Sequence, residues 1–248
     1  MDIQLIRHAT LLIRMGENRI LVDPMLSPAE TRPPIQMSPN PRRNPLVPLP
    51  ELDLRGVDAV LVTHVHSDHF DDAAAGLLPR NVPLFCQPGD EKKLTAAGFS
   101  AIQPVAQNVD WAGIKLVRVG GRHGRGIVRK MMGPVSGFIL RAEGEPSLYI
   151  AGDTICCAEV QQILEAHRPA VTVVNAGAAQ LVVGGAITMT AEDVVRVCRA
   201  APGTQVVAVH MEAINHCLLT RADLRAALES ENLSHRVRIP ADGELMSF

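Results

Sequence analysis

A run of metal-binding side chains after a short apolar stretch limits the folds open to this chain more than any other feature. Residues 59–62 (Ala-Val-Leu-Val) have the pattern of a buried strand, and Thr-His-Val-His-Ser-Asp-His follows directly. Side chains two apart in an extended chain face the same way, so His64 and His66 can converge on one ion. After the chain turns, Asp68 and His69 reach a second ion. The segment therefore predicts two metal sites at the end of a strand.

Three further residues that could bind a metal lie just past the ends of other apolar stretches: His123, Asp153 and His210. Taken singly, each is also explained as an ordinary polar strand end. Ligands placed at strand ends sit on rigid backbone while their side chains stay open to substrate. Together with the first segment, these residues give a set of seven candidate ligands.

The remaining pattern mixes hairpins with strand-helix units. Expected strands cover residues 3–7, 11–15, 19–23, 58–62, 83–86, 114–119, 136–142, 147–151, 171–174, 205–209 and 235–239. Expected helices cover residues 71–78, 90–97, 159–167, 191–200 and 221–229, and the last two follow Thr-x-x-Asp starts at Thr190 and Thr220. This predicts an α/β fold of two mixed sheets packed together with helices outside.

Residues 24–50 form a long proline-rich segment, which holds nine of the 18 prolines. Proline neither continues a helix nor donates to a sheet ladder, so the segment is expected to be a loop. The flanking strands look like parts of one sheet, which favours a functional lid over a domain linker. We therefore expect a single domain over residues 1–248 with a lid at 24–50.

Composition argues against several classes of partner. Lysine and arginine number 24 against 26 acidic residues, and there are one Trp, one Tyr and five Phe, so neither a basic coat nor a stacking surface for nucleic acid is expected. A small-molecule substrate is the better expectation. No apolar run is long enough to span a membrane, and five cysteines without a CxxC pair favour a reducing, cytoplasmic location.

The order His-Val-His-Ser-Asp-His, Arg-His-Gly, Ala-Gly-Asp-Thr and a strand-terminal histidine resembles the metallo-β-lactamase fold superfamily of metal-dependent hydrolases. The segments RHAT at 7–10, LVDP at 21–24 and VAVHMEA at 207–213 resemble its branch of L-ascorbate-6-phosphate lactonase-like and N-acylphosphatidylethanolamine phospholipase-like enzymes. The resemblance covers nearly the whole chain. It implies an αββα sandwich with a dinuclear site in the cleft between the sheets.

The same resemblance distributes the ligands between two metals. It implies that the first metal is held by His64, His66 and His123, the second by Asp68, His69 and His210, and that Asp153 bridges them. Zinc is the default ion for such a site, although manganese and iron accept the same ligands. Two divalent ions generate a bridging hydroxide at neutral pH and polarise the substrate, so no serine or cysteine nucleophile is required.

Several residues receive auxiliary roles. Asp68 is expected to orient the hydroxide as well as bind metal. The resemblance places His8 beside the site, either as an auxiliary catalytic group or as a structural histidine. Asp23 either orients a ligand imidazole or caps its loop. Glu212 and His216 flank the last ligand and are candidates for the cleft wall, although each also has an ordinary structural explanation.

A basic stretch surrounds His123. Residues 118–130 carry four arginines and one lysine without an acid, so Arg122 and Arg125 are candidates for binding an anionic substrate group, unless the stretch is simply a solvated loop. We expect a hydrolase of a small anionic ester, lactone or phosphodiester. A nuclease of the same superfamily and a non-catalytic metal-binding scaffold are the alternatives. A homo-oligomer is compatible with the sequence, although no coiled-coil repeat indicates one.

Overall fold

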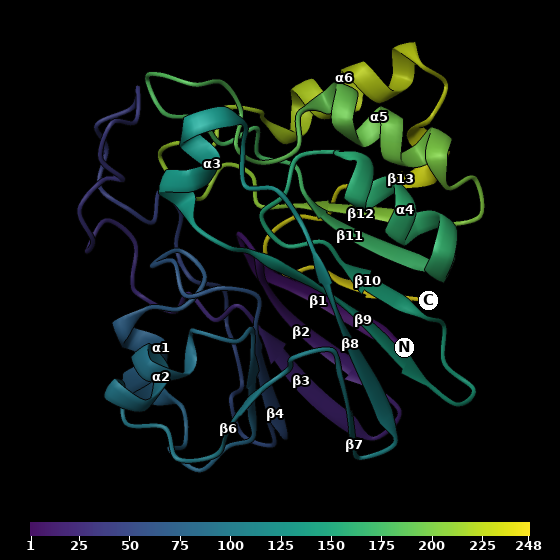
Figure 1. Cartoon of the computed structure of the whole chain (residues 1–248). Coiled ribbons are helices and arrows are strands. Elements are labelled where there is room, and N and C mark those ends of the chain that lie inside the picture. Colours follow the sequence, from purple (N-terminus) through teal and green to yellow (C-terminus); the bar gives the residue numbers. More distant parts are fainter.

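Two seven-stranded β-sheets form the middle of the molecule, as a computed structural model that describes residues 1–248 shows (Figure 1). The first sheet consists, in spatial order, of β14 (Leu245–Ser247), β1 (Asp2–Arg7), β2 (Thr10–Met15), β3 (Asn18–Val22), β4 (Ala59–Val62), β5 (Leu84–Cys86) and β6 (Ile102–Pro104). The second consists of β13 (Val237–Arg238), β12 (Gln205–Val209), β11 (Val171–Asn175), β10 (Leu148–Ile150), β9 (Ser136–Ala142), β8 (Ile114–Gly120) and β7 (Asn108–Trp111).

Both sheets are mixed in the same way. Strands β14, β1, β2 and β3 pair antiparallel, whereas β3 to β6 pair parallel. In the second sheet β7 to β10 pair antiparallel and β10 to β13 pair parallel. The parallel pairs align the carboxyl ends of β3 and β4, and of β10, β11 and β12. Three of these strands, β4, β10 and β12, precede six of the seven predicted ligands, and His123 follows the antiparallel strand β8.

The apolar core lies between the two sheets, and helices cover their outer faces. A cluster of 22 buried residues draws on both sheets, for example Leu61 and Phe138. Helices α1 (Asp72–Leu77) and α2 (Glu91–Ala96) pack on the first sheet. Helices α4 (Ala158–His167), α5 (Ala191–Ala200) and α6 (Arg221–Ser230) pack on the second (Figure 1). The predicted αββα sandwich is confirmed.

Local signals in the sequence set several of these boundaries. Helices α5 and α6 begin where predicted, because Thr190 and Thr220 each accept a hydrogen bond from the backbone N–H three residues on. Thr190 and Asp193 form a reciprocal capping box. The strand expected over 235–239 is shorter, since a 3₁₀ turn at Ser234–Arg236 precedes β13.

Four elements were not predicted: β6, β7, β14 and α3 (Gly126–Met132). Strands β6 and β14 have only three residues each, and β7 is a half-exposed edge strand, so none carries a long apolar pattern. Helix α3 lies inside the basic, glycine-containing stretch, where helix signals are weak. Part of this stretch, which was expected to be a loop, is therefore helical.

The proline-rich segment is a loop, as predicted, with one isolated bridge between Arg32 and Asn44. It is attached to the loop after β12: Leu46 N donates to Ala213 O at 2.7 Å, and Asn215 N donates to Asn44 Oδ1 at 2.9 Å. The segment therefore runs from the first sheet to a ligand-bearing loop of the second. None of the helices has the length and apolar character needed to cross a membrane.

Candidate metal centre

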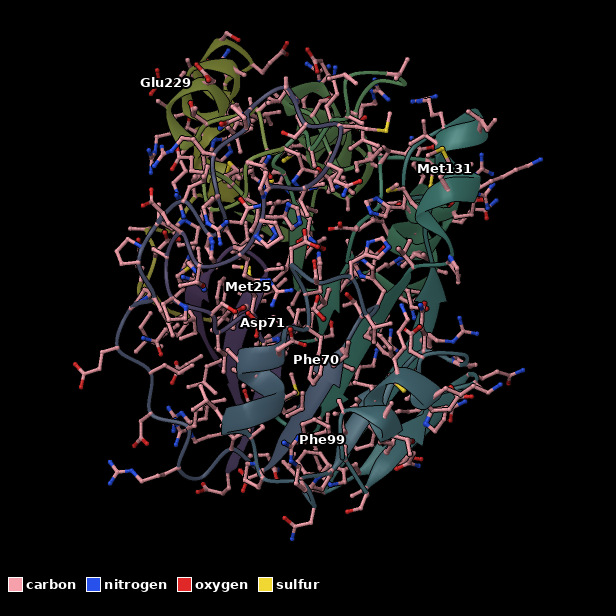
Figure 2. All side chains as sticks on the ribbon, turned by 90° about the vertical axis from the view of Figure 1, so that its left-hand side faces the viewer. Met25, Phe70, Asp71, Phe99, Met131 and Glu229 are labelled. Carbon is pink, nitrogen blue, oxygen red and sulfur yellow. The ribbon has the colours of Figure 1, made fainter.

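All seven predicted ligands meet at one end of the sandwich. His64, His66, Asp68 and His69 come from the loop after β4 in the first sheet. His123, Asp153 and His210 come from loops after β8, β10 and β12 in the second sheet. Figure 2 looks onto this end, with Phe70 and Asp71 marking the start of α1 on one side and Met131 marking α3 on the other. The centre is thus built by both sheets.

The first group contains three histidines whose ligand atoms lie within 4.8 Å of one another: His64, His66 and His123. One ring nitrogen of each is already engaged. His64 Nδ1, His66 Nε2 and His123 Nδ1 contact, in that order, Thr63 Oγ1 at 3.1 Å, Met132 O at 3.0 Å and Ile187 O at 2.9 Å. The other three nitrogens point toward one another: His64 Nε2 lies 3.0 Å from His66 Nδ1, and these two atoms and His123 Nε2 are the ones that could share a cation.

The second group contains His8, Asp68, His69 and His210, whose ligand atoms also lie within 4.8 Å of one another. His69 Nδ1 contacts Asp23 Oδ2 at 2.8 Å, and His210 Nδ1 contacts Cys217 Sγ at 3.5 Å. The Nε2 atoms of His69 and His210 are buried and make no hydrogen bond, although both lie within ion-pair distance of Asp153. Buried imidazole nitrogens without a partner are costly, so this donor set fits a metal ion.

Asp153 lies between the two groups. Its Oδ1 is 3.3 Å from His69 Nε2 and 3.2 Å from His210 Nε2, whereas its Oδ2 is 3.3 Å from His123 Nε2. Asn175, at the end of β11, donates from Nδ2 to Asp153 Oδ1 at 2.6 Å and so fixes the carboxylate. One oxygen therefore faces each group, which is the arrangement that a bridging ligand needs.

Electrostatics keep most of the donors ready for a cation. Burial lowers the pKa of His64 and of His210 well below the ordinary value, against the opposing effect of Asp153. Burial alone would raise the pKa of Asp68 and of Asp153, but the surrounding imidazoles hold both well below their usual range. Neutral imidazoles and ionised carboxylates are the protonation states that bind metal.

Asp23, after β3, organises the motif loop. Its carboxylate accepts hydrogen bonds from Thr63 N and Thr63 Oγ1, each at 2.7 Å, in addition to the contact with His69 Nδ1. Although burial lowers the pKa of His69, the flanking Asp153 and Asp23 raise it well above the ordinary value. Of the two predicted roles, the contact with a ligand imidazole is the one that the structure contains.

His8 contacts the second group through Asp68. The His8 ring is fully buried, its Nε2 lies 3.3 Å from Asp68 Oδ2, and its centroid lies 3.6 Å from that of His210. Burial lowers the pKa of His8 to about 4, against the effect of Asp68. Its ring is therefore neutral at physiological pH, with Nε2 able to donate to Asp68.

A cavity of about 310 Å³ opens onto the ligands, and we call it the apolar cavity. Its walls are Ile35, Gln36, Met37, His66, Ser67, Asp68, His123, Met131, Met132, Asp153, Leu181, Ile187 and His216. His216 thus lies in the wall, as expected, whereas His8 does not. No arginine or lysine lines the cavity. A larger hollow of about 1000 Å³ beside α4 and α5 contains none of the seven ligands.

Arg122 and Arg125 lie elsewhere. They line a separate cavity of about 460 Å³, which we call the arginine cavity, and Arg122 Nε donates to Glu159 Oε1 at 2.7 Å. The structure therefore does not bring these arginines to the apolar cavity. Glu212 is likewise engaged elsewhere, since it accepts a hydrogen bond from Arg221 N at 2.9 Å.

Three supporting residues escaped the sequence analysis: Asn175, Asn215 and Cys217. Asn175 ends a strand, as the residues before the predicted ligands do, but its amide supports the carboxylate of Asp153 and is not itself a typical metal ligand. Asn215 and Cys217 flank His216 and contact the proline-rich loop and His210. No sequence pattern distinguishes them from ordinary loop residues.

The sandwich and the His- and Asp-rich centre at its strand ends define the class of protein, that of the metallo-β-lactamase fold. More narrowly, the chain belongs to the family described as the beta-lactamase superfamily domain, whose model matches residues 18–211. The lactonase-like branch within it stays a prediction.

Relatives and solved structures agree with this assignment. The chain is 38% identical to the UPF0173 protein YddR of Bacillus subtilis, with all of both chains covered. It is 28% identical to a UPF0173 metal-dependent hydrolase of Xanthobacter autotrophicus, over 81% of this chain and 79% of that one. The crystal structure of an isothiocyanate hydrolase from Delia radicum gut bacteria matches with a TM-score of 0.96 and 35% identity, covering 100% of this chain and 99% of that one.

Proposed function

We propose that this protein is a dinuclear metal-dependent hydrolase of small molecules. The observation that carries the proposal is the position of Asp153, whose two oxygens face two separate groups of imidazoles at 3.2 to 3.3 Å. One cation would be held by His64, His66 and His123, and the other by Asp68, His69 and His210. When bound, two divalent ions, zinc by default, supply Lewis acidity and lower the pKa of water.

Asp68 is the residue proposed to orient the attacking water. It lines the apolar cavity, and its carboxylate is ionised because neighbouring imidazoles outweigh its burial and hold its pKa well below the usual range. His8 Nε2 contacts Asp68 Oδ2, and His8 does not line the cavity, so we assign it a positioning role through Asp68. A single oriented oxygen is thereby presented to the substrate.

The cavity wall favours an uncharged substrate. Its side chains above the ligands are mainly aliphatic or methionine, and it contains no arginine or lysine to neutralise an anion. A charged group that contacts this wall, and not the cations, loses hydration without a protein counter-charge. This shifts the expectation from an anionic ester or phosphodiester towards an uncharged carbon electrophile such as a lactone or carboxylic ester.

An isothiocyanate is the second candidate substrate. It is supported by the full-length similarity to an isothiocyanate hydrolase at 35% identity, together with the apolar wall. In this reaction water adds to the central carbon, and the adduct splits into an amine and carbonyl sulfide, so that all atoms of both reactants are accounted for. The electrophilic carbon is uncharged, in keeping with the cavity.

A panel of lactone, carboxylic ester, phosphodiester, isothiocyanate and RNA substrates tests the proposal. Metal-loaded protein should turn over an uncharged substrate, the chelated protein should not, and re-addition of metal should restore turnover. The Asp68→Ala variant should lose at least about 100-fold in kcat. Full turnover by that variant, or by chelated protein, would contradict the mechanism. Preferential RNA cleavage would support the nuclease alternative, and two bound metals without turnover would support a scaffold.

A further inference from the structure

The arginine cavity has no part in the proposed hydrolysis, and its composition is unusual. Its walls include Arg122, Arg125, Arg129, Cys157, Gln161 and Arg196. Four arginines thus line it from three segments: the loop after β8, helix α3 and helix α5. No aspartate or glutamate lines the cavity.

The charges around this cavity do not balance. Arg122 is paired with Glu159, and Arg196 NH1 lies 3.1 Å from Asp193 Oδ1. Arg125 and Arg129 are exposed and have no acidic partner. They stand four apart at the start of α3, where like charges repel each other across one helical turn. Two of the four arginines that line the cavity therefore have no acidic partner.

Backbone donors reach the same cavity. Helix α4 begins there, with Cys157 as its N-cap and Ala158 as its first residue. Cys157 makes no side-chain cap hydrogen bond, and the acidic residue of the first turn, Glu159, is paired with Arg122. The free N–H groups of a ten-residue helix carry partial positive charge at this end. Gln161, one turn further on, adds a polar side chain to the wall.

We propose that the arginine cavity binds a small dianion through a phosphate group, at a site separate from the metal centre. Guanidinium groups donate paired hydrogen bonds that match phosphate oxygens, and unpaired Arg125 and Arg129 supply the two charges that a dianion needs. The volume of about 460 Å³ exceeds that of the phosphate ion itself and leaves room for a small organic group. A phosphate monoester fits this chemistry.

The site is linked by hydrogen bonds to the loops that carry His123 and Asp153. Arg122 N donates to Thr154 Oγ1 at 2.8 Å, and Ile155 N donates to Arg122 O at 2.9 Å. These bonds join the segment that carries His123 to the segment that carries Asp153. A bound dianion would therefore touch the outer side of both loops without entering the apolar cavity.

Calorimetric titration of the metal-loaded protein tests this proposal, with inorganic phosphate and glycerol 3-phosphate as probes at constant ionic strength. We expect saturable binding at one site, weakened at least tenfold in the double variant Arg125→Gln/Arg129→Gln. The matched control is Arg14→Gln/Arg55→Gln, which removes the same charge from two exposed arginines that pair with Asp2 and Asp53. It should bind phosphate as the wild type does.

The proposal is overturned if neither probe binds, if the control pair loses as much affinity as the arginine pair, or if the Arg125/Arg129 variant keeps full affinity. Full affinity in that variant would indicate that phosphate binds at the metal centre and not in the arginine cavity. Tighter binding of glycerol 3-phosphate than of phosphate supports a monoester as the occupant, and the reverse order supports the free ion.

Discussion

The apolar cavity and the arginine cavity share helix α3 but have opposite chemistry. Met131 and Met132 line the apolar cavity, whereas Gly126 and Arg129 line the arginine cavity. The loop before α3 divides in the same way, since His123 faces the metal centre and Arg122 faces Glu159. Adjacent residues thus serve different surfaces. The position of a basic stretch next to a candidate metal ligand predicts where the backbone lies. It does not predict which cavity the arginine side chains line.

The largest effect expected at the metal centre alone comes from Asp153→Asn. The amide keeps the size of the side chain but removes the charge that faces both histidine groups. Turnover should fall by about 10³-fold, equal to about 4 kcal/mol of activation free energy. Metal content measured by mass spectrometry should fall below two ions per chain. Asp110→Asn, at an exposed position of β7, is the control.

The same variant separates the two cavities. Asp153→Asn should leave phosphate affinity at the arginine cavity within about threefold of wild type, because that site needs no metal. A parallel loss of phosphate binding and metal would show that both ligands occupy one site.

A large stability effect is expected from Asn215→Ala, which releases one wall of the apolar cavity. Asn215 Oδ1 accepts from Ile35 N at 3.0 Å and from Asn44 Nδ2 at 2.8 Å, and its Nδ2 donates to Asn40 O at 2.5 Å. At about 1 kcal/mol for each bond, the loss is about 2–4 kcal/mol, or about 5–10 °C in Tm.

Residues 35–37 line the apolar cavity only, so Asn215→Ala should also raise KM while leaving phosphate affinity unchanged. Differential scanning calorimetry and substrate kinetics measure the two effects. An unchanged KM with a lowered Tm would mean that the proline-rich loop does not act as a lid.

A smaller effect is expected from Asp23→Asn, which acts on a ligand without touching the metal. The amide cannot accept all three hydrogen bonds from Thr63 and His69 Nδ1 as the carboxylate does. Metal affinity should fall about 10–100-fold, as measured by competition with a chromophoric chelator. Wild-type metal affinity in this variant would reduce Asp23 to a loop cap.

The smallest effect is expected from Met131→Ala in the apolar wall. Met131 is 60% exposed, so truncation removes roughly 1 kcal/mol of substrate contact and raises KM about fivefold with little change in kcat. Ile127→Ala is a matched control, since Ile127 lies on the same helix, is 75% exposed and does not line the cavity. Equal KM changes in both variants would argue against the proposed substrate contact.

The sequence was informative where chemistry coincides with strand ends. The apolar stretch at 59–62 and the candidate ligands after it predicted a strand with a metal site at its carboxyl end. Parallel pairing places the carboxyl ends of β10, β11 and β12 at the same edge of the second sheet. Six of the seven candidate ligands are buried and the seventh, His66, is half-buried. Surrounding residues therefore restrict their side chains, and the strand ends largely determine where they lie.

The sequence was less informative where side-chain direction decides the outcome. Arg122 lies next to His123 along the chain, yet it pairs with Glu159, 37 residues on, because the chain reverses direction around β10 and brings the start of α4 alongside. Asn215 and Cys217 act through partners that are close only after the proline-rich loop and β12 have met. Such long-range contacts leave no periodic signal in the chain.

The origin of the ligands in both sheets has a mechanical consequence. Each histidine group takes residues from the loop after β4 and from loops of the opposite sheet, so each cation would cross-link the two sheets. Ions that bind only the folded chain stabilise it by mass action, by about 2.7 kcal/mol at a hundredfold excess over Kd. Removal of the ions by a chelator would then lower the free energy of unfolding, by weakening the contact between the two sheets, as well as stop catalysis.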